Sequence, residues 1–211
     1  MPSAIPCAIP SVIASVIASA AQLLAEVRAC SLCAGLLPLA PRPVVQLDPA
    51  ARILIASQAP GLKVHATGVP FNDASGERLR GWLGVTSEQF YNPRLFAIVP
   101  MGLCYPGRGV SGDLPPRPEC ASRWRAPLLR NLAQLRLTLV IGHYALAYHL
   151  PQERAGLTAA VRNWRRHWPA AMVLPHPSPA NNRWFARNRW FEQELVPVLR
   201  ARVVQVLGDE G

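Results

Sequence analysis

Four short apolar runs at wide spacing constrain the fold of this chain more than any other feature of its sequence. Each is rich in Val, Ile and Leu and lacks the alternation of a half-exposed strand, as expected for strands covered on both faces. The runs are "RILIAS" (52–57), "LFAIVPM" (95–101), "LTLVIG" (137–142) and "AAMVLPH" (170–176). Segments with helical spacing of apolar residues follow them, at 75–84, 118–135, 156–168 and 182–207. This alternation predicts an α/β/α sandwich around a four-stranded parallel sheet.

Size and charge narrow the class of protein further. The chain has 211 residues, half of them apolar, which is enough for one α/β domain with a proper core and excludes an intrinsically disordered chain. Its 22 basic and 12 acidic residues leave a net charge of +10, which indicates a polyanionic partner such as nucleic acid. A codon bias toward arginine is the competing explanation for the many arginines, but it does not account for the excess of base over acid.

The first 27 residues are apolar and small, and they predict an N-terminal extension with a docked helix. Pro10, several serines and Gln22 interrupt the apolar run from Ala8 to Ala25, which makes it a poor membrane span. A secretory signal is the alternative, although the segment lacks a positively charged start. We expect an extension over residues 1–27 and a single domain over 28–207, in a cytoplasmic monomer that does not bind membranes. The residues at helical spacing are Ile13, Val16, Ile17, Ala20, Leu23, Leu24 and Val27.

The first apolar run leads directly into a loop rich in glycine and proline, "SQAPGLKVHATGVPFNDASG" (57–76). Gly61, Gly68 and Gly76 permit tight turns, so backbone N–H groups of this loop can face a phosphate or a base edge. Phe71 is an aromatic residue among polar ones, which suits a platform for a stacked base, although burial under the loop is the other interpretation. The loop is not a P-loop, because no Gly-Lys-Ser/Thr follows.

The last apolar run ends in Pro175-His176-Pro177-Ser178-Pro179. Proline supplies no backbone N–H and fixes its own φ, so these prolines end the strand and hold His176 on a stiff loop. Ligands of open α/β sheets bind at the carboxyl ends of the strands, which makes His176 a candidate site residue. The alternative is an ordinary surface histidine beside a necessary chain stop.

These two loops resemble the first and last motifs of the uracil-DNA glycosylase superfamily, most closely its iron–sulfur-containing branch. The first motif reads Gly-Glu-Ala-Pro-Gly, then Thr-Gly-x-Pro-Phe, then a small residue and Gly; here "SQAPG" (57–61), "TGVPF" (67–71) and "SG" (75–76) match its spacing. The last motif is a strand that ends in His-Pro-Ser-Pro. The resemblance covers about residues 28–200. It implies a DNA glycosylase that excises uracil or another damaged base.

The resemblance also implies roles for individual residues. His176 would donate a hydrogen bond to the departing base, which gains negative charge as its bond to the sugar breaks. Phe71 would stack on the base once it is flipped out of the duplex. From the residues themselves, His65 and Asp73 are the titratable candidates that flank Phe71, and His65 is the candidate that activates or orients water. The alternatives are a solvent-exposed loop histidine at position 65 and a helix cap at Asp73. The residues expected around the base are Gln58, Ala59, Gly61, Asp73 and Ser178.

The chain departs from the branch in residues that matter for function. Gln58 replaces the Glu of the first motif, and the positions just after Gly61 (62–65) hold none of the branch's acidic residues. Val99 and Pro100 stand where the Asn that reads uracil is expected. Two further functions therefore stay open. One is a nucleic-acid-binding relative without catalysis, and the other is a hydrolase that acts on a small nucleoside or nucleotide.

DNA is the expected partner, and two residues after the histidine loop are the expected contacts. Arg183 is placed to neutralise a phosphate. Asn182, or its neighbour Asn181, occupies the region from which the superfamily inserts a side chain into the duplex. Aromatic and arginine residues also alternate over 162–168 and 181–191, where the simpler interpretation is aromatic core with arginine on the solvated face.

Four cysteines predict a metal centre. Cys30 and Cys33 form a Cys-x2-Cys pair, and Cys104 and Cys120 lie farther along the chain. Without a clear export signal, a metal is a better explanation than disulfides. Spacing alone does not separate a tetrahedral zinc ion from a cubane cluster. The resembling branch places its ligands in this arrangement, which implies a structural 4Fe–4S cluster, with zinc as the alternative.

Overall fold

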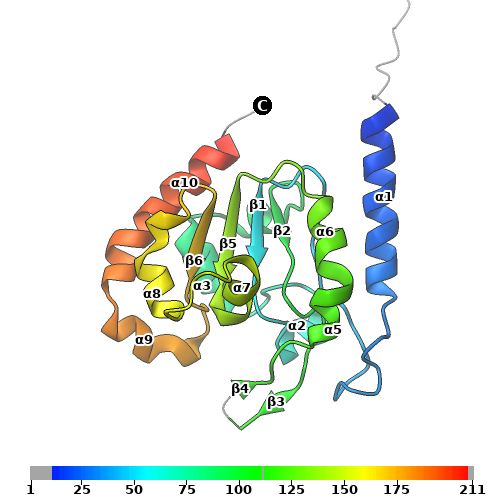
Figure 1. The fold of residues 1–211 in the computed structure, drawn as a ribbon, viewed down its shortest axis with the longest axis horizontal. Helices are drawn as coiled ribbons and strands as arrows, with labels where there is room; N and C mark the ends of the chain where they lie inside the picture. Colours follow the sequence, from blue (N-terminus) through cyan, green and yellow to red (C-terminus); the bar gives the residue numbers. More distant parts are fainter. Residues whose placement is uncertain (1–10, 111, 209–211) are drawn as a thin grey trace, which may run out of the picture.

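All four apolar runs form strands of one parallel sheet, in the order β2-β1-β5-β6. The computed structural model describes residues 11–110 and 112–208, with side chains from residue 19 onward (Figure 1). Each strand is shorter than its run, because residues at one or both ends of the run lie outside the sheet. The strands are β1 (Ile53–Ala56), β2 (Phe96–Ile98), β5 (Leu137–Ile141) and β6 (Ala171–Leu174).

The sheet is covered on both faces, which explains why its strands lack alternation. Ile53, Leu54, Ile55 and Ala56 follow one another along β1 and are all at most 1% exposed. Figure 1 shows α7 (Gly142–His149) in front of the sheet and α3 (Ala74–Leu83) behind it. The predicted α/β/α sandwich with a four-stranded parallel sheet is therefore confirmed.

The remaining elements surround this sheet. The other α-helices are α1 (Ser11–Arg28), α2 (Leu62–Thr67), α4 (Ser87–Tyr91), α5 (Pro118–Cys120), α6 (Ala126–Arg130), α8 (Leu157–Arg162), α9 (Asn182–Arg187) and α10 (Val196–Gly208). Short π-helical turns lie at η1 (Ala121–Arg125) and η4 (Phe191–Leu195), and 3-10 turns at η2 (Trp164–Arg166) and η3 (Pro179–Asn181). A small antiparallel hairpin pairs β3 (Arg108–Gly109) with β4 (Gly112–Asp113).

The ends of two helices follow from their local residues. The cap of α3 is Asp73, whose carboxylate accepts a hydrogen bond from the Gly76 N–H, so the helix-cap interpretation of Asp73 is confirmed. Pro197 is the second residue of α10, which follows the π-helical turn η4 directly. The pattern over 182–207 therefore becomes α9, a π-helical turn and α10.

The N-terminal helix docks as predicted over its described side chains. Ala20, Leu24 and Val27 of α1 are buried, and the helix packs against α6. The side chains of Ile13, Val16 and Ile17, which belong to the same predicted face, lie outside those the structure describes. Within the described ranges, no helix is both long and apolar enough to cross a membrane.

Candidate active site

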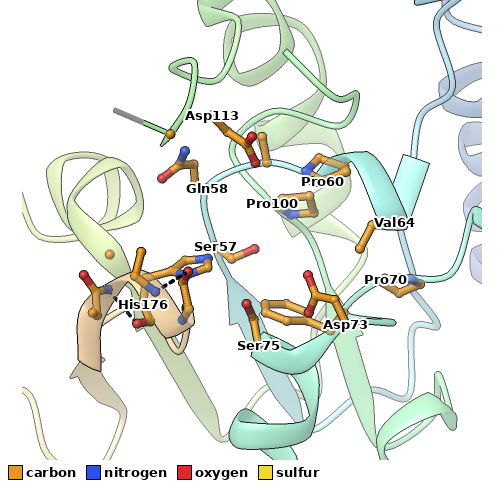
Figure 2. Close-up of a pocket in the computed structure, with 18 of the residues that line it drawn as sticks. Ser57, Gln58, Pro60, Val64, Pro70, Asp73, Ser75, Pro100, Asp113 and His176 are labelled. Carbon is orange, nitrogen blue, oxygen red and sulfur yellow. Dashed lines mark hydrogen bonds between the residues drawn. The ribbon is translucent and has the colours of Figure 1, made fainter. Parts of the chain in front are cut away.

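A cavity of about 510 Å³ lies at the carboxyl ends of the four strands. Every strand supplies part of its wall, since Ser57 follows β1, Pro100 follows β2, Gly142 follows β5 and His176 follows β6 (Figure 2). This volume falls within the range of about 300–1,000 Å³ that is usual for small-ligand pockets.

The two loops that carry the predicted site meet in this cavity. The first-motif loop reaches it from β1, and the histidine loop reaches it from β6. Seven of the residues predicted around the base line it together, namely Gln58, Ala59, Gly61, Phe71, Asp73, His176 and Ser178.

Phe71 is held in a backbone conformation that few bulky residues adopt. Its φ is 54°, in the left-handed region, and its ring packs edge-on against Phe90 at a centroid distance of 6.1 Å. The hydroxyl of Tyr91 donates a hydrogen bond of 3.4 Å to its carbonyl oxygen. A Cβ on Gly76 would lie only 1.8 Å from that same oxygen, so this turn requires glycine at position 76. Such strain is characteristic of functional sites.

His176 is prepared to act as a neutral hydrogen-bond donor. Its Nδ1 accepts a hydrogen bond of 3.2 Å from the Ser178 N–H, so the neutral ring carries its proton on Nε2. Burial lowers the pKa of His176 below the ordinary histidine value, and the Asp73 carboxylate opposes this by raising it. The Asn181 amide donates to the carbonyl of His176 at 2.8 Å, which fixes the loop.

Arg78 joins the two motifs, and sequence reasoning missed it. Its guanidinium donates to the carbonyls of Pro177 (3.2 Å) and Ser178 (3.3 Å). It also donates to Oδ1 of Asn182 at 2.8 Å. Because Arg78 lies on α3, it holds the histidine loop against the helix that follows Phe71. An arginine on a helix face carries no signal in the sequence that would predict this contact.

Comparison with known proteins identifies this architecture. The family model of the uracil DNA glycosylase superfamily matches residues 44–200, about three quarters of the chain. The chain belongs to the uracil DNA glycosylase superfamily. Among solved structures, the solution NMR structure of a candidate uracil DNA glycosylase from Methanosarcina acetivorans is similar, with 22% sequence identity and a TM-score of 0.42. That match covers 76% of this chain and 98% of the other.

One predicted site residue of this superfamily member is not at the cavity. Val64 lines the cavity, but His65 is the next residue along α2 and points to a different side, since successive helical residues are rotated by about 100°. The His65 ring lies beside Tyr105, with centroids 6.3 Å apart, and its Nδ1 is buried without a partner among the described residues. The expectation that His65 faces the base is therefore corrected.

Two titratable residues that the sequence analysis did not select line the cavity instead. Asp113 comes from the hairpin and His143 from the start of α7. His143 directly follows "LTLVIG", so its place at the carboxyl end of a predicted strand was a usable signal. Asp113 lies in a loop rich in glycine and proline, where no local pattern marks it.

The two predicted DNA contacts of this superfamily member lie beside the cavity. Arg183 and Asn182 are exposed at the start of α9, next to Asn181, which lines the cavity. The Asn182 side chain accepts from Arg78, while Arg183 extends into solvent without a hydrogen bond or ion pair to the described residues.

The four cysteines of this superfamily member surround a second, small cavity. Cys30, Cys33, Cys104 and Cys120 line it together with Trp124, whose indole N–H donates to the Cys30 sulfur at 3.3 Å. All four are free of disulfides. Burial raises the pKa of Cys104 to about 12 and also raises that of Cys120, which disfavours their thiolate forms.

No three Cys, His, Asp or Glu side chains in the described part of the chain lie close enough together to hold one metal ion. The four free thiols around the small cavity nevertheless offer the sulfur ligands that both zinc ions and iron–sulfur clusters use.

Proposed function

We propose that this protein is a DNA N-glycosylase that takes a damaged base, uracil or another, into the cavity and hydrolyses its bond to the sugar. The observation that carries the proposal is the presence of the Phe71 ring and the neutral His176 donor in one cavity. Cleavage places negative charge on the departing base, and a fixed donor in a partly buried site stabilises that charge. The rigid proline loop keeps the donor in place before the reaction begins.

Gln58 is the residue that we assign to reading the base edge. It is one of two carboxamides that line the cavity, and the other, Asn181, already donates to the His176 carbonyl. Gln58 forms no side-chain hydrogen bond with the described residues, so both its donor and its acceptor are available. The carbonyls of Val99 and Pro100, where the superfamily's Asn is missing, accept instead from the buried Arg125, at 2.9 and 3.3 Å.

Exposed basic side chains around the cavity support DNA as substrate over a small nucleotide. Lys63 on α2, Arg108 on the hairpin and Arg183 on α9 are all exposed. Figure 1 shows these three elements at the same end of the molecule. Positive charge around a base pocket attracts the phosphates on either side of a flipped nucleotide.

We also propose that Cys30, Cys33, Cys104 and Cys120 hold a 4Fe–4S cluster with a structural role. The cluster would join the segment after α1 to the loop before the hairpin, which holds Cys104, and to α5, which ends at Cys120. The Trp124 N–H donor to Cys30 suits a cluster thiolate, because hydrogen bonds to the sulfurs stabilise their negative charge.

The function is tested by incubating the protein with duplexes that carry uracil, hypoxanthine or xanthine. We expect release of the free base and an abasic site that alkali cleaves from at least one of them. Binding to duplexes without release of any base would identify a non-catalytic relative. Release from free nucleosides but not from DNA would identify a small-molecule hydrolase.

Phe71→Ala should weaken capture of the flipped base. The loss of base–aromatic stacking is expected to reduce the preference for lesion-containing over undamaged duplex by about 1–3 kcal/mol. Titrations of both duplexes by fluorescence anisotropy measure this preference. Phe71→Tyr keeps the aromatic face and serves as the control. An unchanged preference in Phe71→Ala would show that Phe71 only packs against the core.

Arg183→Ala should weaken binding to all duplexes alike, because phosphate contacts carry no sequence information. The slope of log affinity against log salt should decrease in magnitude by about one, as expected for the loss of one phosphate contact. Arg94→Ala is the matched control, since Arg94 is also exposed but precedes β2 and therefore lies near the amino ends of the strands. Equal salt slopes for both variants would contradict a phosphate contact at Arg183.

A further inference from the structure

The β3–β4 hairpin brings a carboxylate into the proposed base cavity from a segment that belongs to neither motif. Asp113 lines the cavity, and its Oδ2 lies 3.5 Å from the position that a Cβ on Gly61 would occupy. Asp113 therefore lies beside the first-motif loop. Figure 2 shows it near Gln58, on the other side of the cavity from His176 and Ser75.

The other carboxylate of the cavity is already engaged. Asp73 caps α3 through a hydrogen bond of 3.0 Å from the Gly76 N–H to its Oδ1. No described residue donates a hydrogen bond to the Asp113 side chain. Of the two carboxylates, Asp113 is thus the one whose oxygens are both available to a ligand or a water molecule.

The surroundings of Asp113 favour its carboxylate as a proton acceptor. Burial raises the pKa of Asp113, the nearby Asp73 raises it further, and Arg108, its partner across the hairpin, lowers it. The net pKa lies above the ordinary aspartate value. A carboxylate with a raised pKa accepts a proton more readily than an ordinary aspartate does. His176 and His143 are the other titratable groups on the cavity wall.

We infer that Asp113 is the carboxylate that orients and deprotonates the attacking water in the reaction proposed above. The water oxygen forms the new bond to the sugar carbon, and the bond from that carbon to the base nitrogen breaks. The electron pair leaves with the base, which accepts a hydrogen bond from Nε2 of His176. The water proton passes to Asp113 and then to solvent, and solvent protonates the free base. Asp113 thus supplies a carboxylate to a cavity in which Gln58 replaces the Glu of the first motif.

Single-turnover base release with Asp113→Asn tests this inference, which rests on the proposed function. The isosteric change should slow release by at least about 10²-fold, within the range of about 10²–10⁴ for a general base, with unchanged DNA affinity and melting temperature. Asp48→Asn is the matched control. Its carboxylate accepts from the Ala50 N–H before β1, far from the cavity, and an amide oxygen can do the same.

The pH profile separates a catalytic role from a structural one. The wild-type rate should fall at acid pH as Asp113 becomes protonated, and Asp113→Asn should lose this acid limb. Arg108→Gln should move the limb to higher pH, because Arg108 lowers the pKa of Asp113. The inference about Asp113 would be overturned, with the proposed function intact, if Asp113→Asn released the base at the wild-type rate. It would also be overturned if Asp113→Asn were slow but its rate still fell at acid pH. A wild-type protein that releases no base from any duplex would overturn the proposed function as well.

Discussion

His176→Ala is expected to slow base release by about 10²–10³-fold, the scale seen when one preorganised donor is removed from an anionic transition state. The Ser178 N–H occupies Nδ1, and the Asn181 amide and Arg78 hold the loop, so Nε2 is fixed before the base arrives. Alanine leaves the loop prolines in place but removes the donor. DNA affinity should change little, because the donor acts on charge that develops only during cleavage.

Single-turnover release of the base from a lesion-containing duplex measures this effect. His167→Ala is the control, since its imidazole pairs with Glu153 at 2.9 Å and does not line the cavity. The control should retain the rate of release even if it melts at a lower temperature. Release at the wild-type rate by His176→Ala would end the proposed role of this histidine.

Cys104→Ala should cost the protein both its metal and much of its stability. Anaerobically purified wild-type protein is expected to be brown and to contain about four irons per chain, as a cubane requires. The free energy of metal binding is folding free energy in such sites, so loss of a ligand should lower the melting temperature together with the iron content. The effect should be large, because the cysteines join segments that are distant in sequence.

Iron analysis, visible absorption and thermal melting measure these changes together. Cys7→Ala is the matched control, because Cys7, the fifth cysteine of the chain, does not belong to the set of ligands predicted from the sequence. Colourless protein with one zinc ion per chain would keep the site and reject the cluster. If the wild-type protein contained no metal and Cys104→Ala did not change its melting temperature, both the metal site and the cluster would be rejected.

The sequence by itself determined the sheet and the general location of the site. Continuous burial along β1 requires apolar residues at consecutive positions, so a strand covered on both faces is visible as an uninterrupted run. The loops after the first and last strands were also predictable, because parallel strands all end at the same edge of their sheet. Phe71 and His176 therefore had to lie near one another once the strand order placed both loops at one cavity.

Only the tertiary structure decided which other side chains reach that cavity. His65 was expected there and turns away, because one residue along a helix changes the direction of a side chain by about 100°. Arg78 and Asp113 were not expected, because the contacts of Arg78 with the histidine loop and the position of Asp113 beside Gly61 bring together segments that no local pattern relates. Periodicity and turn residues report what is buried and where the chain bends. The approach of a hairpin to a distant loop depends on how all the layers pack.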